Sequence, residues 1–412
     1  MALTLTSCGG GDSAGGGDNA TIRLVAADYG DSADNSSEKY WDELVDAFEA
    51  KNPGIRVNVE VHSWNDVDQR VADMVRSGDA PDMAQIGAYA DYAAQGRLYS
   101  ADELLSIPTQ ADFLPGLAQA GEVHRVQYGL PFASSTRVLF YNKTLFAKAG
   151  ITAPPKTWAE LQQDAQALKA AGAQTPYGLP LGPEEPQAET LNWMLSGGGG
   201  YTDNVGSYTF DSDANVKTFE WLRDELVAKG LTNPKPGSTN RKEVYAAFAD
   251  GQVGMVNGHP TLMRMADAKN VQYGMAPLPG KDGTSAATTG VADWMMAFKQ
   301  HGHREQVGKF LDFVYQRDNV LKFADQYDLL PVTTTASEAM RADKDNKHLW
   351  EFLDELHTAE FYPVSKLSWA PVVSKLKKSI GATVEKNGDP ASVLGELERD
   401  AEATENSART QD

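Results

Sequence analysis

Two hydrophobic periods alternate in the N-terminal part of the chain, and this alternation limits the fold more than any other feature. The apolar run 22–27, the strictly alternating run 55–61 and the run 81–86 predict three strands. Between them, residues 37–52 and 67–78 repeat apolar side chains at helical spacing. Strands that alternate with helices in this way form an open α/β sheet with helices on its faces. The buried stripe predicted for the first helix consists of Trp41, Leu44, Val45 and Phe48.

The same alternation returns later in the chain. A strand is predicted over 137–142, and a helix over 157–171 begins at a capping box of Thr157 and Glu160. A chain of 412 residues exceeds what one ordinary hydrophobic core supports, so two α/β lobes are expected. The other predicted elements are helices over 213–229, 304–316 and 373–386, and short apolar strands over 253–256, 271–275 and 294–298.

The charge balance disfavours several classes of function. With 37 Lys and Arg against 57 Asp and Glu, the net charge is -20, which repels nucleic-acid backbones and anionic lipid. No apolar run approaches the roughly 20 residues that span a bilayer. The glycine-rich stretch 196–203 lacks the lysine of a phosphate-binding loop, and His301 and His303 lack a third metal ligand nearby. We therefore expect no nucleic-acid partner, no cofactor and no metal.

The N-terminus holds the single cysteine of the chain. Leu5, two small residues and Cys8 resemble the lipobox of bacterial lipoproteins, in which cleavage leaves a lipidated cysteine as the first residue. Glycine-rich sequence follows it, so residues 1–20 are interpreted as a signal remnant and a flexible tether. The alternative is a stray cysteine in a loose terminus. A G-x-S-x-G match at residues 11–15 lies in the tether, without the strand and helix that a nucleophile elbow needs.

Residues 128–161, "YGLPFASSTRVLFYNKTLFAKAGITAPPKTWAEL", resemble the extracellular solute-binding proteins of ATP-binding-cassette (ABC) importers, in the maltose-binding-protein-like family. Segments at 77–98, 247–260, 275–280 and 288–315 match the same family in the same order. The resemblance implies a two-lobed periplasmic-binding-protein-like fold. Each lobe would be an open sheet flanked by helices, with the ligand cleft between the lobes.

The resemblance also implies a division of the chain and a function. The protein would capture a carbohydrate, such as an oligosaccharide, without catalysis and deliver it to the permease subunits. We expect a monomer on the extracellular face of a bacterial membrane, which it touches only through a lipid on Cys8. The expected parts are an N-terminal lobe of 21–131 and 290–333, a C-terminal lobe of 132–289 and 334–400, and a tail of 401–412.

Candidate ligand contacts lie on loops that follow strands or where the chain crosses between lobes. Sugar sites pair aromatic platforms with carboxylates and amides, and the candidates are of these types. Relatives that bind maltose place a stacking tryptophan near position 259, where this chain has histidine. Glu185 and Trp369 match an acidic and an aromatic position of those relatives. The full set of candidates is Asp28, Tyr29, Trp64, Asn65, Gly87, Tyr89, Phe132, Glu185, Asn257, His259, Asp293, Trp294 and Trp369.

Two alternatives remain at this level. Each tryptophan could pack in a core instead, which is the interpretation adopted for Trp41 and Trp158 because both lie on predicted helices. The fold could bind another solute, such as a polyol, glycerol phosphate or an amine. Less favoured is a secreted glycoside hydrolase, which would need two carboxylates about 5–10 Å apart across the scissile bond.

Overall fold

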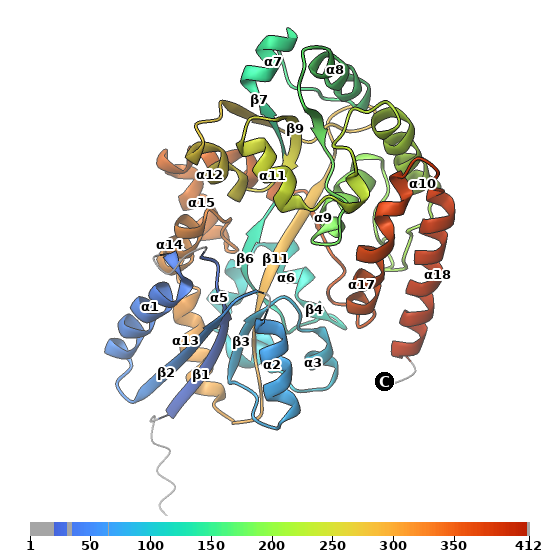
Figure 1. The fold of residues 1–412 in the computed structure, drawn as a ribbon. Helices are drawn as coiled ribbons and strands as arrows, with labels where there is room; N and C mark the ends of the chain where they lie inside the picture. Colours follow the sequence, from blue (N-terminus) through green and yellow to red (C-terminus); the bar gives the residue numbers. More distant parts are fainter. Residues whose placement is uncertain (1–19, 31–34, 65, 410–412) are drawn as a thin grey trace, which may run out of the picture.

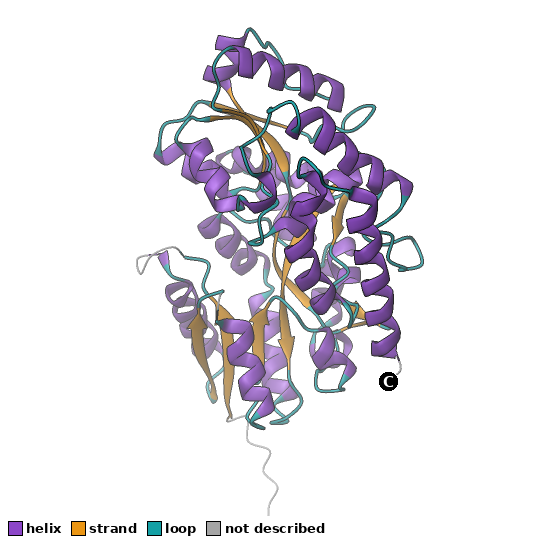
Figure 2. Ribbon diagram, turned by 45° about the vertical axis from the view of Figure 1, so that its right-hand side comes forward, coloured by secondary structure: helices purple, strands orange, loops and turns teal. Residues whose placement is uncertain are grey.

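The computed structural model describes residues 20–30, 35–64 and 66–409, and it has two lobes joined by strands that run between them (Figures 1 and 2). The expected two-lobed α/β architecture is confirmed. The first part of the chain forms β1 (Ala20–Ala27), α1 (Ser37–Lys51), β2 (Ile55–His62), α2 (Val67–Arg76), β3 (Met83–Ile86), α3 (Ala90–Ala94), α4 (Ala101–Leu104), α5 (Ile107–Asp112), α6 (Pro115–Ala120), β4 (Glu122–Val123), β5 (Val126–Gln127) and β6 (Leu130–Ser135).

The sheet of the N-terminal lobe contains the strands predicted at the start of the chain. Its order is β12-β11-β3-β1-β2, and β6 pairs with β11. Strands β1, β2 and β3 are parallel, so their carboxyl ends meet at one edge. The sheet includes β11 (Thr288–Ala297) and β12 (Ala359–Phe361), and α13 (Arg304–Val314) and α14 (Arg317–Tyr327) pack in the core of this lobe. The chain also forms α15 (Thr334–Ala342) and α16 (Trp350–Leu356), and the buried side chains of α16 pack in the core of the C-terminal lobe.

Helix α1 shows how sequence periodicity sets the packing of this lobe. The side chain of Ser36 accepts a hydrogen bond from the N–H of Glu38 and caps the helix. Trp41, Leu44 and Phe48 are buried as predicted, and Tyr40 joins them. Val45 was predicted to share this stripe but is only half-buried, because it lies at the margin of the face that meets the sheet.

The sheet of the C-terminal lobe has the order β10-β7-β9-β8. Strand β7 lies antiparallel to both of its neighbours, whereas β8 and β9 are parallel. The strand predicted over 271–275 exists, but it is an edge strand with half-buried residues, so the expectation of a buried strand there was wrong. The elements of this lobe are β7 (Val138–Asn142), α7 (Lys143–Ala149), α8 (Trp158–Ala170), β8 (Thr175–Gly178), α9 (Pro186–Ser196), α10 (Asp213–Trp221), α11 (Arg241–Ala249), β9 (Val253–Gly258), α12 (Thr261–Ala268), β10 (Tyr273–Ala276), α17 (Trp369–Ser379) and α18 (Pro390–Arg409).

Strand β11 passes from one lobe to the other. The prediction of a short strand over 294–298 was too short, because β11 has ten residues and starts at Thr288. The N–H of Thr289 donates to Asn192 Oδ1 of α9 at 3.0 Å, which holds the start of β11 against the C-terminal lobe. Its register with β6 shifts between Asp293 and Trp294. Such irregularities re-aim side chains, and this one lies where the strand leaves one lobe for the other.

The end of the chain differs from the expectation of a tail from residue 401. Helix α18 continues to Arg409, and Ala401 is completely buried against the C-terminal lobe. Glu405 of this helix pairs with Lys366 at 2.9 Å and accepts a hydrogen bond from Ser368. The prediction placed a tail at 401–412, but Ala401 continues the buried stripe of Leu394 and Leu397 on α18.

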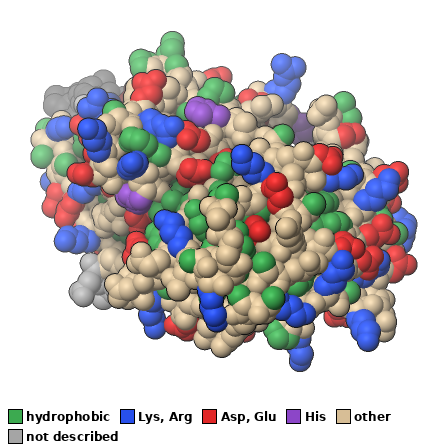
Figure 3. All heavy atoms as spheres, turned by 90° about the horizontal axis from the view of Figure 1, so that it is seen from above, with side chains coloured by type: hydrophobic (Ala, Val, Ile, Leu, Met, Phe, Trp, Pro, Cys, Tyr) green, Lys and Arg blue, Asp and Glu red, His purple; other side chains and the backbone are tan. Residues whose placement is uncertain are grey.

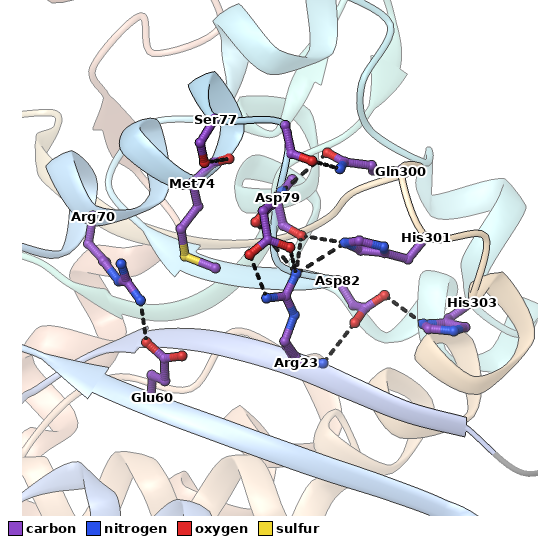
Figure 4. A network of polar contacts seen from close by, with 12 residues as sticks. Arg23, Glu60, Arg70, Met74, Ser77, Asp79, Asp82, Gln300, His301 and His303 are labelled. Atoms are coloured by element: carbon purple, nitrogen blue, oxygen red, sulfur yellow. Dashed lines mark hydrogen bonds and ion pairs between the residues drawn. The ribbon is translucent and has the colours of Figure 1, made fainter.

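A polar network closes the N-terminal lobe at the end opposite the carboxyl ends of β1–β3 (Figure 4). Arg23 contacts Asp79 at 2.8 Å and the carbonyl of Ala80 at 2.9 Å. His303 contacts the buried carboxylate of Asp82 at 2.9 Å, and His301 contacts the carbonyl of Ala80. The two histidines therefore tie the loop after β11 to the loop before β3. The structure shows no group of three or more potential metal-ligating side chains among the residues it describes.

The charged surface and the length of the helices can be compared with what the composition predicts. Seen from above, acidic and basic side chains are interspersed over the C-terminal lobe (Figure 3). Within the described part of the chain, no helix is both long enough and apolar enough to cross a lipid bilayer.

Candidate functional site

Asp293 of β11 lies at the junction of the lobes and is bound by the N-terminal lobe. The hydroxyl of Tyr29, after β1, donates to Asp293 Oδ2 at 2.7 Å, and Gln85 Nε2 donates to that hydroxyl at 2.9 Å. Asp293 is half-buried, and burial raises its pKa to about 7, with further upward contributions from Asp68 and Glu185. Among the residues that the structure describes, Tyr29 is the only hydrogen-bond partner of this carboxyl, so Oδ1 is left without a protein partner.

The loop after β2 contributes an aromatic ring and a second carboxylate. The half-buried ring of Trp64 meets the ring of Tyr29 edge to face, with centroids 5.4 Å apart. Asp68 is exposed, and yet burial raises its pKa, while the N–H of Gly87 opposes that shift from 3.2 Å. The predicted contact Asn65 lies outside the described residues.

The C-terminal lobe contributes a chain of charged groups centred on Glu185. Arg137 Nη2 lies 3.2 Å from one oxygen of Glu185, and Arg241 Nε lies 2.6 Å from the other. Arg241 also reaches Glu184 at 3.1 Å and His259 Nε2 at 3.0 Å. Burial, and then the charges of Arg137 and Arg241, hold the pKa of His259 well below its usual value. Glu185 and His259, both predicted contacts, therefore share one cluster.

Tyr362, which was not among the predicted contacts, lies near charged groups of both halves of this site. Its hydroxyl is shielded from solvent and has no hydrogen-bond partner among the described residues. Its pKa is raised by burial, and it interacts electrostatically with Glu185 and Arg137 of one lobe and with Asp293 of β11. The sequence offered little signal for it, because Tyr362 follows a three-residue strand that periodicity alone does not reveal.

Trp369 was predicted to stack on ligand, but the structure places it inside an aromatic layer. Its ring lies between Tyr201 and Tyr362, with centroid distances of 5.3 Å and 5.8 Å, and only 7% of the residue is exposed. The ring of Tyr362 is stacked on it at an interplanar angle of 24°. Trp369 therefore supports Tyr362 and has little surface of its own for a ligand.

Several other predicted contacts are structural in this conformation. The carboxylate of Asp28 accepts hydrogen bonds from the N–H groups of Gly30 and Ser37 at the start of α1, and these lower its pKa although burial opposes them. Three aromatic residues that were predicted to contact ligand are almost wholly buried among core side chains, so the prediction was wrong for them. These are Tyr89 (0% exposed), Trp294 (1%) and Phe132 (6%).

Asn257 is also buried, and it contacts an acidic side chain, Glu189, that was not among the predicted residues. Its Nδ2 donates to Glu189 Oε1 at 3.1 Å, and Trp193 Nε1 donates to the same oxygen at 2.7 Å. Glu189 is 5% exposed, and burial raises its pKa to about 7. Glu189 and Asn257 therefore belong to the interior of the C-terminal lobe and not to its ligand-facing surface.

Both lobes thus contribute side chains to the site: aromatic rings, carboxylates and arginines that are paired with glutamates. The model of the family described as bacterial extracellular solute-binding protein matches residues 33–321, and a putative binding protein of Brucella abortus is 30% identical over 392 residues, covering 94% of this chain and 93% of the relative. This chain belongs to the bacterial extracellular solute-binding protein family.

Other relatives of this solute-binding protein are more distant. An uncharacterized lipoprotein of Streptomyces antibioticus is 27% identical and covers 71% of this chain and 67% of its own length. The sn-glycerol-3-phosphate-binding periplasmic protein UgpB of Brucella abortus is 26% identical, with 64% of each chain covered. Membership of the family implies a small-molecule solute and the permease of an ABC importer as partners.

Solved structures agree on the fold of the solute-binding protein. The cyclic alpha-maltosyl-1,6-maltose binding protein from Arthrobacter globiformis superposes with a TM-score of 0.80 at 18% identity, covering 94% of this chain and 100% of the other. The sugar-binding protein MalE from Xanthomonas citri gives a TM-score of 0.78 at 21% identity, with 95% and 98% covered. At these identities the likeness establishes the two-lobed architecture.

Proposed function

We propose that this protein is the substrate-binding component of an ABC importer that captures an oligosaccharide between its lobes, without catalysis, and delivers it to the permease as a monomer. The observation that carries the proposal is the combination of Trp64, Tyr362 and Asp293 where the lobes meet. Aromatic faces complement the apolar face of a pyranose ring, and a carboxylate accepts hydrogen bonds from its hydroxyl groups.

Glycerol phosphate is the main alternative solute, since a relative of the chain binds it. A phosphate ligand needs cationic groups that are free to pair with it. Arg137 and Arg241 are both engaged by Glu185, and Arg241 is engaged by Glu184 as well. The pairing of these arginines favours an uncharged ligand over a phosphate.

A thermal-shift and calorimetry screen tests the proposed function. The panel contains maltose, maltotriose, cellobiose, xylobiose, glycerol, sn-glycerol 3-phosphate and putrescine. A ligand that binds the folded state raises the melting temperature by mass action, so a shift with an oligosaccharide supports the proposal. Binding of glycerol phosphate or putrescine alone contradicts it. Release of monosaccharides from a disaccharide during the incubation contradicts the absence of catalysis.

At pH 8, where the Asp293 carboxyl with its pKa of about 7 is mostly ionised, Asp293→Asn is expected to weaken binding of the oligosaccharide about ten- to a hundredfold, because a hydrogen bond to a charged acceptor contributes about 1.5–3 kcal/mol. The amide retains an oxygen that can accept from Tyr29, so the junction between the lobes is expected to survive. Isothermal calorimetry measures the affinity. Asp73→Asn, an exposed carboxylate on α2, is the matched control and is expected to bind normally. Unchanged affinity of Asp293→Asn would remove this residue from the ligand site.

The proposal includes how the protein is held at the cell surface. We propose a lipid anchor on Cys8, which lies outside the described residues, at the extracellular face of a bacterial membrane. The lipobox-like residues and a lipoprotein among the relatives support it. A cysteine that carries several acyl chains anchors stably, whereas one chain anchors only marginally.

Cys8→Ala, expressed in a bacterium behind a complete lipoprotein signal, is expected to move the protein from the membrane fraction to the soluble fraction. Its affinity for ligand is expected to stay the same, because residues 1–19 precede the folded lobes. Fractionation and immunoblotting measure the distribution. Retention of the variant on membranes at the wild-type level would refute the anchor.

A further inference from the structure

His259 occupies the turn after β9 in a geometry that restricts its chemistry. Its backbone N–H donates to the hydroxyl of Tyr245 at 3.1 Å, and the ring of Tyr245 lies 5.2 Å from the imidazole. The guanidinium of Arg241 contacts His259 Nε2 at 3.0 Å. Both the backbone and the ring of His259 are thus held by α11.

The contact with Arg241 determines which nitrogen of His259 carries the proton. A guanidinium can only donate, so Nε2 must accept, and an imidazole that accepts at Nε2 is neutral with its proton on Nδ1. The neighbouring charges act in the same direction. Arg137 and Arg241 both oppose a positive charge on the ring, and the glutamates of the cluster are already paired with these arginines.

The other nitrogen of His259 is available to a ligand. Nδ1 has no partner among the described residues, and it is not one of the polar atoms sealed from solvent. The residue itself is half-buried within the cluster that contains Glu185. A neutral ring with one free N–H can donate a hydrogen bond and can accept none at that position.

We propose that His259 is a specificity-determining residue that donates its Nδ1–H to an oxygen acceptor of the bound solute, and that Arg241 is the positioning residue that holds this tautomer. The inference rests on the proposed function, because it assigns a role within the same interlobe site. The class of group it selects is a hydroxyl, ring or glycosidic oxygen. A protonated amine, which has no lone pair to accept with, is rejected at this position.

The tautomer is tested first on the ligand-free full chain labelled with ¹⁵N-histidine. We expect the His259 signals of a protonated Nδ1 and an unprotonated Nε2, unchanged from about pH 5 to 8, where an ordinary histidine titrates. His259→Asn identifies the signals by their loss. In Arg241→Met, the Nε2–H tautomer is expected to become populated. The proposal is overturned if the wild-type ring is protonated on Nε2, or if the tautomer populations are the same in Arg241→Met as in wild type.

The donor role is tested by calorimetry with the panel oligosaccharide that gives the largest thermal shift. His259→Asn keeps an N–H donor near the place of Nδ1 and is expected to stay within about threefold of wild type, whereas His259→Phe is expected to bind about tenfold more weakly. Equal affinity of the phenylalanine variant overturns the donor role while the proposed function stands. A wild-type chain that binds no saccharide contradicts the proposed function, and the donor role with it, even if the tautomer is as expected.

Discussion

Trp369→Ala is expected to lower the free energy of unfolding by about 3–5 kcal/mol, the usual cost of removing a large aromatic side chain from a core. The ring is 7% exposed and packs between Tyr201 and Tyr362 within the aliphatic and aromatic core of the C-terminal lobe. Its removal leaves a cavity that the surrounding helices can fill only in part. Denaturant unfolding followed by tryptophan fluorescence and circular dichroism measures the loss.

Trp64→Ala is the matched comparison for this prediction. Trp64 is half-buried in the loop after β2 and contacts mainly Tyr29, so its truncation is expected to cost less stability. It is expected to weaken oligosaccharide binding about ten- to a hundredfold through lost burial of apolar surface. If Trp369→Ala keeps its stability and loses affinity instead, the ligand reaches the aromatic layer and Trp369 is a contact after all.

Glu189→Gln is expected to stabilise the protein by about 2–3 kcal/mol above pH 7. Burial raises the pKa of Glu189 to about 7, from an ordinary value near 4.5. Between these two values the folded state holds a proton that the unfolded state has released, so stability falls as the pH rises through this window. Glutamine removes the charge and keeps an oxygen that can accept from Trp193 and Asn257.

The pH dependence distinguishes this mechanism from a general change in packing. The difference between Glu189→Gln and wild type is expected to be largest near pH 8 and to vanish below about pH 4.5, where both side chains are neutral. Denaturant unfolding at several pH values measures it. Glu189→Ala is the control, and it should destabilise at every pH because it leaves the donors of Trp193 and Asn257 unpaired. A glutamine variant that is less stable than wild type at pH 8 would contradict this mechanism.

Local periodicity predicted the elements whose pattern lies within one segment, but it missed others, such as β8, α9 and α11. The stripe of α2, the alternation of β2 and the capping box of α8 are patterns within one segment, and the structure confirms all three. Predictions failed where an element depends on its neighbours in space. The edge position of β10, the length of β11 and the extension of α18 past Ala401 are set by pairing and packing with distant parts of the chain.

The candidate site shows the same difference between what depends on local sequence and what depends on tertiary packing. The sequence by itself determined the class of protein and the two-lobed fold, because these depend on residue types in order along the chain. Only the tertiary structure decided that Trp369, Trp294 and Tyr89 are buried, and that Tyr362 stacks on Trp369. The physical reason is that a side chain's exposure and partners depend on which distant segments pack against it. The pairing of Arg137 and Arg241 with Glu185, and the contact of Arg241 with His259, join residues that lie far apart in the sequence.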